Sequence, residues 1–151
     1  MGVLIKPESF NPAQLQAAHE SSMVADKGVA GHFGATASFI GTMRHFNEGD
    51  DVIGMMLEHY PGMTEKELEA VIKDAHKKWD IQDALIVHRV GDIKPGEPIV
   101  LTAVWSAHRA AAFDACRFLM EALKSRAPFW KKETLKNGSH RWVERNTPGY
   151  F

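Results

Sequence analysis

The residues with the clearest chemical potential lie in one segment near the C-terminus, Arg126-Ala127-Pro128-Phe129-Trp130-Lys131-Lys132-Glu133. Its proline ends the preceding helical pattern, and two aromatic residues stand directly before two lysines. Aromatic faces and ammonium groups together can bind a flat heterocycle that carries a phosphate. The same residues could instead form a core-packing Phe-Trp pair with solvated lysines beside it, so the residue types alone leave both interpretations open.

Positive charge is concentrated around this segment. Positions 124–145 hold seven basic and two acidic residues, whereas the whole chain of 151 residues has 18 Lys and Arg against 19 Asp and Glu, a formal net charge of −1. This near-neutral total argues against a protein that binds nucleic acid or an anionic membrane with its whole surface. The basic C-terminal third predicts a local site for an anionic substrate or an acidic partner, with a solvated hairpin as the alternative.

A second candidate anion site is the string Ser106-Ala107-His108-Arg109, where a long helix is expected to begin with Ser106 as its N-cap. Free N–H groups and the helix dipole favour an anion at that end. Lys124 lies near the other end of the same helix, where the dipole favours a cation. Arg44 follows a predicted strand, at a loop edge where binding groups are common. Each of these cations is also explained as ordinary surface charge.

The sequence gives no sign of a metal site, a disulfide, a nucleotide-binding motif or a serine hydrolase motif. The eight histidines form no His-Glu-x-x-His motif or close pair, and Cys116 is the single cysteine, so we expect no metal site and no disulfide. The usual glycine-rich nucleotide motifs and the Gly-x-Ser-x-Gly motif of serine hydrolases are missing from the sequence. Lys6 and Pro7 interrupt the apolar start of the chain, and no apolar stretch approaches the roughly 18 residues of a membrane span. We therefore expect a cytoplasmic protein.

The elements that must position these residues alternate between helix and strand. Asn11 followed by Pro12 has the pattern of an N-cap with proline at the first helical position, which predicts a short helix to about Met23. Small, β-branched and apolar runs bounded by glycine and proline predict strands at residues 34–42, 52–60, 84–90 and 98–105, with a polar loop at 44–51.

Two long helices and a hairpin complete the prediction. Thr64-Glu65-Lys66-Glu67 has the spacing of a capping box at the start of a helix. The inner face of the helix after Ser106 is expected to consist of Phe113, Cys116, Met120 and Leu123. Lys136-Asn137-Gly138-Ser139 predicts a turn between strands at 131–135 and 140–144. We expect a single domain over residues 1–151, of the α+β class, with a mostly antiparallel sheet, two long helices and a C-terminal β-hairpin.

These segments together resemble a known family, the large catalytic subunit of molybdopterin synthase. The resemblance runs from about Gly34 to Val143. It is carried by Gly41-Thr42-Met43-Arg44, Leu57-Glu58-His59-Tyr60-Pro61-Gly62-Met63, His88-Arg89-Val90-Gly91, Ser106-Ala107-His108-Arg109 and Leu123-Lys124-Ser125 followed by the segment described first.

The resemblance implies an α/β-hammerhead type of fold and a sulfurtransferase of molybdenum cofactor biosynthesis. Its substrate would be cyclic pyranopterin monophosphate (precursor Z), converted to the dithiolene of molybdopterin by two sulfur transfers. The sulfur would arrive as a thiocarboxylate on the C-terminal Gly-Gly tail of a small ubiquitin-like subunit. The resemblance further implies a homodimer of large subunits within a heterotetramer, with no cofactor, no nucleic acid and no membrane involved.

The resemblance also implies roles for particular residues. Lys124 and Lys131 match the catalytic lysines, with Lys124 meeting the incoming tail and Lys131 gripping the substrate. A desolvated lysine can act as a general acid or base, or can stabilise an oxyanion. The full set of implied substrate-binding residues is Thr42, Met43, Arg44, His108, Arg109, Lys124, Lys131, Lys132, Glu133 and Arg141. Which protomer's pocket receives His108 and Arg109 is left open.

Two other functions remain alternatives. The basic hairpin and Phe129-Trp130 could belong to a non-catalytic module that binds an anion or single-stranded nucleic acid by charge and stacking. The chain could also be a scaffold that retains the fold and partner without activity, although the basic residues at positions 44, 108, 109, 124 and 131 are all present.

Overall fold

The computed structural model describes residues 2–143. In chain order its elements are β1 (Gly2–Lys6), α1 (Pro12–Lys27), β2 (Ala35–Thr42), β3 (Phe46–Asn47), β4 (Asp50–His59), α2 (Met63–Lys78), β5 (Ile81–Arg89), β6 (Gly91–Ile93), β7 (Pro98–Ser106), α3 (Arg109–Arg126), β8 (Phe129–Leu135) and β9 (His140–Trp142). The predicted end of the hairpin at Glu144 lies outside the described residues.

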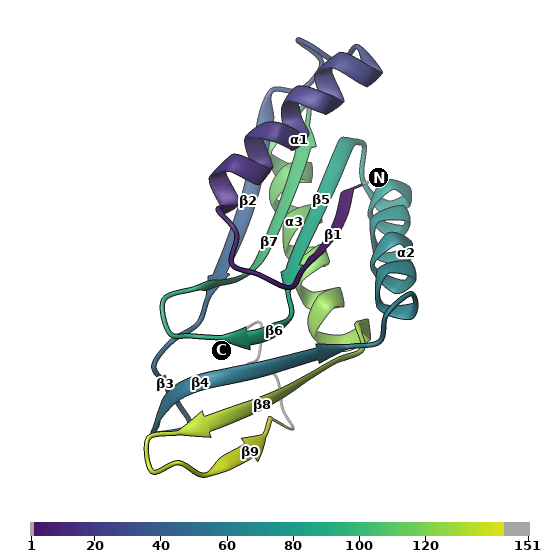
Figure 1. Ribbon diagram of the computed structural model, residues 1–151. Helices are drawn as coiled ribbons and strands as arrows, with labels where there is room; N and C mark the ends of the chain where they lie inside the picture. The colour runs from purple at the N-terminus through teal and green to yellow at the C-terminus, as the bar shows by residue number, and fades with distance from the viewer. Residues whose placement is uncertain (1, 144–151) are drawn as a thin grey trace.

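Two sheets organise the molecule (Figure 1). The main sheet has the strand order β1-β5-β7-β2, in which β1 pairs with β5 in parallel and the other neighbours are antiparallel. The lower sheet has the order β3-β4-β8-β9, with β6 also pairing with β4, and its pairs are antiparallel. Strands β4 and β8 cross below the lower end of the main sheet. The aromatic residues and lysines of β8 thus lie in a different sheet from strands β1, β5, β7 and β2.

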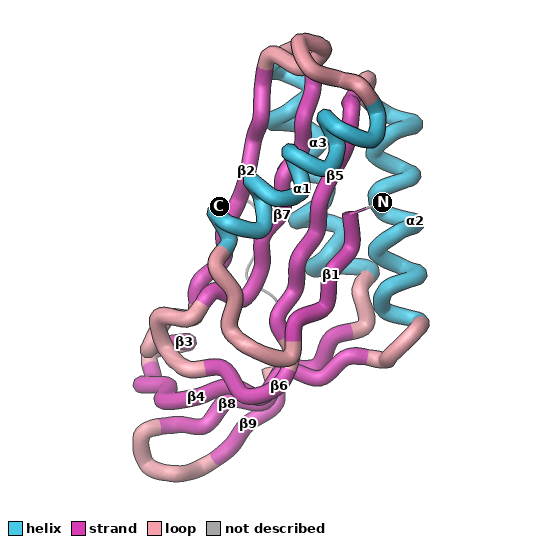
Figure 2. The backbone as a smooth tube through the Cα atoms, turned by 45° about the horizontal axis from the view of Figure 1, so that its top comes forward, coloured by secondary structure: helices cyan, strands magenta, loops and turns pink. Residues whose placement is uncertain are grey.

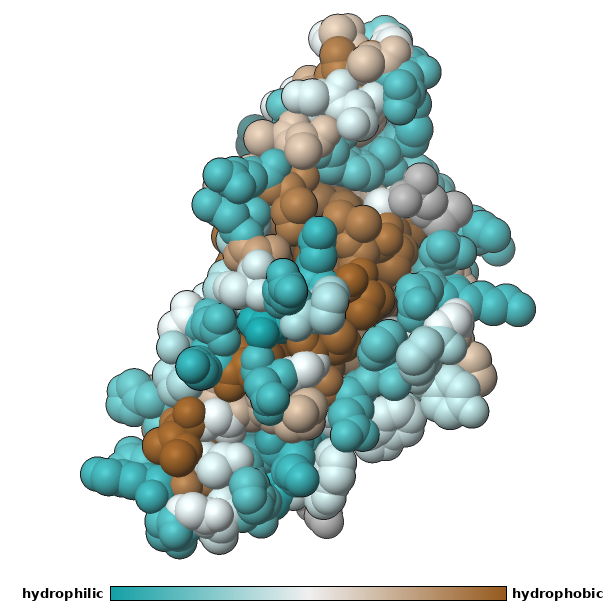
Figure 3. Space-filling model, in the orientation of Figure 1, coloured by the Kyte–Doolittle hydropathy of each residue, from teal (hydrophilic) through white to brown (hydrophobic). Residues whose placement is uncertain are grey.

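Helices cover both faces of the main sheet (Figures 1 and 2). Side chains alternate along each strand, so β5 sends Leu85 and Val87 toward α1 and sends Ala84 and Ile86 toward α2 and α3. The cluster on the α2 and α3 side is the larger one. Figure 3 shows apolar atoms gathered over the middle of the α1 face, where that helix covers the strands only in part.

A third apolar cluster joins the two sheets. Its buried members are Met43, Val52, Met55, Leu57, Val90 and Ile93. Ile5 and Phe129 pack against both this cluster and the cluster beneath α2 and α3. The lower sheet is therefore held to the main sheet by continuous packing, which fixes the position of β8 relative to α3.

The expected α+β class with a mostly antiparallel sheet is confirmed, as are the four main strands and the hairpin. For each of the three helices, part of the expectation was wrong. The first helix continues to Lys27, where Gly28 adopts φ 62° as its C-cap, so the described residues include three long helices instead of two. Helix α2 begins before Thr64, and the capping carboxylate is that of Glu65, which accepts a hydrogen bond from Gly62 N–H at 3.2 Å.

Helix α3 differs from its prediction at its start and on its inner face. It begins at Arg109, because Ser106 belongs to β7 and donates its hydroxyl to the carbonyl of Asp80. Phe113 is 66% exposed and was wrongly placed in the core. The buried face is instead formed by Ala112, Ala115, Cys116, Leu119, Ala122 and Leu123. Small residues allow α3 to lie close to the sheet, which a phenylalanine on that face would prevent.

Three short strands were not expected: β1, β3 and β6. The last of these lies between the predicted strands at 84–90 and 98–105 and pairs with β4. β1 was missed because five residues carry little periodicity, and its partner β5 is far away in the sequence. β3 lies inside the predicted polar loop and pairs with the start of β4. Glu48 and Gly49, with φ values of 51° and 81°, make the tight turn between them, a conformation that favours glycine.

Candidate active site

A cavity of about 1370 Å³ lies between α3, the edge strand β2 and the lower sheet. Six of the residues expected to bind substrate line it, and they come from three separate parts of the chain: Thr42, Met43, Arg44, Lys124, Lys131 and Glu133. The cavity also carries exposed aromatic side chains along its edge, those of Phe39, Phe46, Phe113, Trp130 and Trp142. Cations and flat apolar faces therefore occur in one concave site.

The two expected catalytic lysines meet because the chain turns sharply between α3 and β8. Lys124 lies in the last turn of α3. Arg126 anchors that turn to α2 by ion pairs to Glu67 at 2.9 Å and Asp74 at 2.7 Å. The buried Thr64 hydroxyl then donates to the carbonyl of Pro128 at 3.3 Å, just before β8 begins. Helix, turn and strand thus present both lysines to the same cavity.

The electrostatic environment of Lys131 is unusual for a lysine. Burial and the adjacent Lys124 ammonium together lower the pKa of Lys131 to about 8, while the Glu133 carboxylate acts in the opposite direction. Like charges that share a partly buried site disfavour the charged form of each. Such a depressed pKa in a cavity is typical of functional sites, because it makes proton transfer accessible near neutral pH.

Arg44 is held at the cavity by a backbone connection to the loop before β7. Met43 N–H donates to the carbonyl of Glu97, and Gly96 N–H donates to the carbonyl of Met43, both at 2.9 Å. The Arg44 guanidinium lies 4.9 Å from the centre of the Phe46 ring. Arg89, which is buried, pairs with the Glu97 carboxylate at 3.5 Å. Arg89 of the main sheet therefore holds the loop in place, and the loop holds the backbone next to Arg44.

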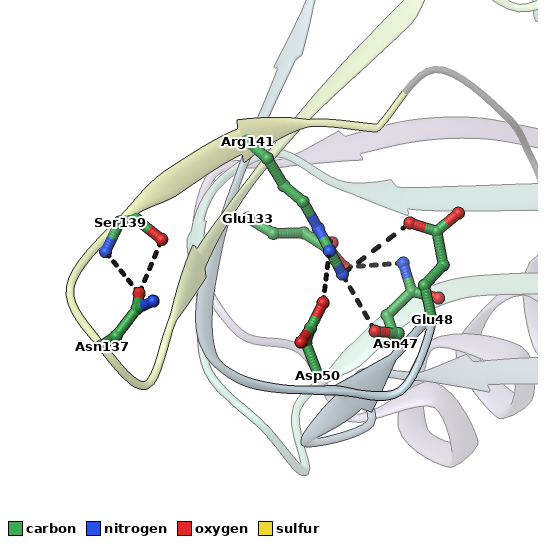
Figure 4. Close-up of polar contacts among 7 residues, drawn as sticks. All are labelled: Asn47, Glu48, Asp50, Glu133, Asn137, Ser139 and Arg141. Carbon is green, nitrogen blue, oxygen red and sulfur yellow. Dashed lines mark hydrogen bonds and ion pairs between the residues drawn. The ribbon is translucent and has the colours of Figure 1, made fainter.

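Arg141 and Glu133 form a compact polar cluster, shown in Figure 4. The Arg141 guanidinium donates to Glu133 at 2.9 Å, to Asp50 at 2.7 Å and to the carbonyl of Asn47 at 2.9 Å. Asn47 also donates its amide to Glu133 at 3.0 Å. These carboxylates raise the pKa of Arg141. Arg141 does not line the cavity, and its donors bind the β3–β4 turn to β8.

Lys132 is also not among the cavity residues. Side chains alternate along a strand, so Lys132 does not project with Lys131 and Glu133. Its ammonium lies 5.7 Å from the centre of the Trp142 ring, which stands at the edge of the cavity.

His108 and Arg109 lie at the other end of α3 from Lys124 and do not line this cavity. At about 1.5 Å per residue, the helix separates them from Lys124 by on the order of 20 Å. Both are exposed. A single chain therefore does not bring these two side chains to its own lysine pair.

Sequence reasoning gave no role to His88, which lines the cavity and is 6% exposed. The signal that could have found it is an ionisable residue at the end of an otherwise apolar strand run. Cys116 is buried with its thiol 3.4 Å from the Thr102 hydroxyl, and burial raises the pKa of that thiol, as suits a packing residue.

Within residues 2–143, no three His, Cys, Asp or Glu side chains come close enough together to hold a metal ion. In the same part of the chain, every helix is too short or too polar to cross a membrane.

Comparison with known proteins decides the family. The family model described as MoaE protein matches residues 7–126. The chain belongs to the MoaE family. The molybdopterin synthase catalytic subunit of Pseudomonas aeruginosa is 48% identical over 145 residues, which is 95% of this chain and 91% of that protein. The structure of the molybdopterin biosynthesis MoaE protein from Burkholderia ambifaria MC40-6 superposes with a TM-score of 0.76 at 42% identity, covering 97% of this chain and 92% of that one.

A MoaE-type fold also occurs in a solved complex. A structure described as the protein-protein complex of subunits 1 and 2 of molybdopterin-converting factor from Helicobacter pylori 26695 matches with a TM-score of 0.75 at 19% identity, covering 96% of this chain and 92% of that chain. The expected family, its α+β fold and its place among the transferases of molybdenum cofactor synthesis are confirmed.

Proposed function

We propose that this MoaE-family chain transfers sulfur from the C-terminal thiocarboxylate of a small ubiquitin-like subunit to cyclic pyranopterin monophosphate. The observation that carries the proposal is the meeting of Lys124 and Lys131 in one cavity, where the pKa of Lys131 is about 8. A cavity with two ammonium groups and aromatic edges suits a substrate that joins a phosphate to a flat heterocycle.

The lysines divide the chemistry between them. In each transfer a tail sulfur bonds to a side-chain carbon of the pterin and an oxygen substituent leaves that carbon, in one transfer as the phosphate oxygen of the opened cyclic phosphate and in the other as water. Water then attacks the tail carbonyl and cleaves its bond to that sulfur. The tail leaves as a carboxylate, and the sulfur remains on the substrate. Lys124, in its cationic form, stabilises the oxyanion that water creates at the carbonyl. Lys131 binds the phosphate, and the bound anion raises its pKa because the charged form gains a partner.

His108 and Arg109 act in the pocket of a neighbouring copy. They are exposed and about 20 Å along α3 from their own lysine pair. A homodimer that sets the start of α3 beside the partner's cavity would add an imidazole and a guanidinium to Arg44 at the phosphate. Arg44, Thr42 and Met43 complete the substrate contacts from the β2 side.

Glu133, Lys132 and Arg141 support the site in different ways. Glu133 lines the cavity and opposes the positive charge at Lys131. Arg141 shapes the site through Glu133 and the β3–β4 turn, since its donors are taken by acidic side chains and a carbonyl. Lys132, beside Trp142 at the edge of the cavity, meets the incoming acidic partner.

The assembly we propose is a heterotetramer in the cytoplasm, with a dimer of this chain at its centre and a small subunit on each copy. Residues 1–151 act as one domain in it. The complex of subunits 1 and 2 from Helicobacter pylori supports a two-subunit arrangement for chains of this fold. The nucleic-acid alternative has less support, because Arg141 of the hairpin is already paired with carboxylates.

Reconstitution tests the proposal. The purified chain is mixed with a thiocarboxylated small subunit and cyclic pyranopterin monophosphate, and dithiolene-containing product is assayed. We expect product and a complex with one small subunit per chain. A stable complex without product would indicate the scaffold function instead, and the failure to form any complex would contradict the proposed partner.

A further inference from the structure

His88 is a buried ionisable residue at the cavity to which the proposed mechanism assigns no task. Its imidazole ring stacks on Phe129, with ring centroids 3.9 Å apart and planes inclined by 17°. Phe129 is the first residue of β8 and precedes Lys131 on the same face of that strand. A close ring contact at Phe129 therefore restricts where the strand that carries Lys131 leaves the turn after α3.

The protonation state of His88 follows from its contacts. Its Nδ1 lies 2.8 Å from the carbonyl oxygen of Arg89, and since a carbonyl only accepts, Nδ1 carries the hydrogen. Burial lowers the pKa of His88 to about 3, against the hydrogen bond to the Arg89 carbonyl, which raises it, and with contributions in the same direction as burial from Lys131 on β8, Lys124 on α3 and His59 on β4. The ring is therefore neutral at pH 7, and it places no additional positive charge beside the two lysines.

The neighbouring Arg89 uses the opposite face of β5. Its guanidinium donates to the carbonyl of Asp92 at 2.6 Å and pairs with Glu97, in the loop that holds Met43. The carbonyl that accepts the hydrogen bond from His88 thus belongs to Arg89, whose side chain is itself held in place on the opposite face of the strand. His88 is consequently restrained from two directions, by the Arg89 backbone and by the Phe129 ring.

We propose that His88 is a positioning residue for the lysine pair: its uncharged ring, fixed by the Arg89 carbonyl and stacked on Phe129, sets the start of β8 and keeps water away from Lys131. The proposal rests on the proposed function, in which Lys131 binds the substrate phosphate. Removal of the ring opens space beside Lys131. The entry of water there stabilises the ammonium and returns Lys131 toward an ordinary lysine.

The test is a titration of the Lys131 side chain by NMR, in the full chain with isotope-labelled lysine. The wild-type midpoint is expected near pH 8. His88→Ala is expected to raise it by at least about one pH unit, and Phe129→Ala by a similar amount, with a double variant that adds little because the two rings act together. His88→Phe retains a ring on Phe129 and is expected to stay within about half a unit of wild type.

A matched control is available on the other side of the main sheet. His19 stacks on Trp105 with centroids 5.2 Å apart, far from the lysine pair in the fold. His19→Ala should lower stability without moving the Lys131 midpoint. An equal shift in His19→Ala, an unmoved midpoint in His88→Ala, or a shift in His88→Phe as large as in His88→Ala would each overturn the proposal.

Sulfur transfer supplies a second readout. His88→Ala is expected to slow turnover by at least about tenfold, while His88→Phe stays within about threefold of wild type. The titration needs no substrate and no small subunit, so it decides the positioning role even if the wild-type chain transfers no sulfur. A wild-type chain without transfer would instead contradict the proposed function.

Discussion

Two buried charge clusters at opposite ends of β5 are built on different principles. Near the start of the strand, Asp83 is bound by His19 at 3.1 Å, by Lys27 at 3.2 Å and by the N–H of Ala84 at 2.8 Å. Near its end, Lys131 faces a second lysine. In the first cluster a buried carboxylate has a lysine and hydrogen-bond donors around it. In the second, a lysine has a like charge beside it whose effect, together with burial, outweighs that of the Glu133 carboxylate.

The pKa values express this difference. Burial by itself raises the pKa of Asp83, but the hydrogen bonds from His19, Ala84 and Lys27 outweigh it and hold the pKa at about 2. At Lys131, burial and the neighbouring cation act in the same direction, and the pKa falls to about 8. A compensated charge, such as that of Asp83, stabilises the fold, whereas a charge that its surroundings disfavour, such as that of Lys131, lowers stability and is retained where chemistry needs it.

The largest effect should come from removing one cation of the lysine pair. Lys124→Ala is expected to reduce turnover at least about a thousandfold, because the oxyanion loses its stabilising charge. Folding and small-subunit binding should persist, since a lysine at a helix end contributes little to stability. The measurements are the reconstituted assay, thermal unfolding and the stoichiometry of the complex. Lys136→Ala, in the exposed hairpin turn, is the matched control and should leave turnover unchanged; unfolding of the Lys124 variant would refute the assignment.

A smaller effect, on stability alone, should follow from breaking the compensated cluster. Asp83→Asn is expected to lower the free energy of unfolding by about 2 kcal/mol, because His19 and Lys27 lose their carboxylate. Urea unfolding measures this, and turnover per folded molecule should stay near wild type. The exposed Glu69→Gln on α2 serves as control.

The stability difference between wild type and Asp83→Asn should depend on pH. The pKa of Asp83 is lowered from 3.8 to about 2, so its stabilisation is present above pH 3.8 and is lost as the pH falls through about 2. The difference between wild type and Asp83→Asn should therefore shrink between about pH 4 and pH 2. A difference that is constant over this range would show that the carboxylate charge is not what stabilises α1.

The smallest effect should be a gain. The folded pKa of Lys131, about 8, lies below its ordinary value of 10.5, so at pH 7 the fold holds an ammonium in a site that disfavours it. Lys131→Met is expected to raise the free energy of unfolding at pH 7 by about 1 kcal/mol, a figure that allows for partial solvent screening. Wild-type stability should rise from about pH 8 to pH 10.5, so the advantage of the variant should shrink there. A Met variant less stable than wild type at pH 7 would contradict this view of the cluster, whatever its turnover.

Much of the fold was predictable, because its elements carry local signals. The Asn11 cap, the alternation along the strands and the hairpin turn each depend on neighbouring residues. The errors share a cause. Phe113 was placed inside because helical spacing does not say which of two faces meets the sheet, and β1 was missed because its pairing with β5 is not local.

The candidate site was predictable only as a set of residue types. The motifs named both lysines and Arg44, which do line one cavity. They did not indicate that Arg141 would donate hydrogen bonds to Glu133, Asp50 and Asn47. Nor did they indicate that the His88 ring would stack on that of Phe129. Such contacts join residues far apart in the chain, and no spacing within a motif encodes them.

The sequence by itself determined the family, the class of fold and the cations and aromatic residues available for chemistry, because composition and local pattern are sufficient for those. Only the tertiary structure decided which cations share a cavity, which are neutralised and which lie at the far end of α3. The reason is electrostatic: a side chain's protonation state and partners depend on burial and on charges a few ångströms away, and these distances are set by how α3, β5 and β8 pack together.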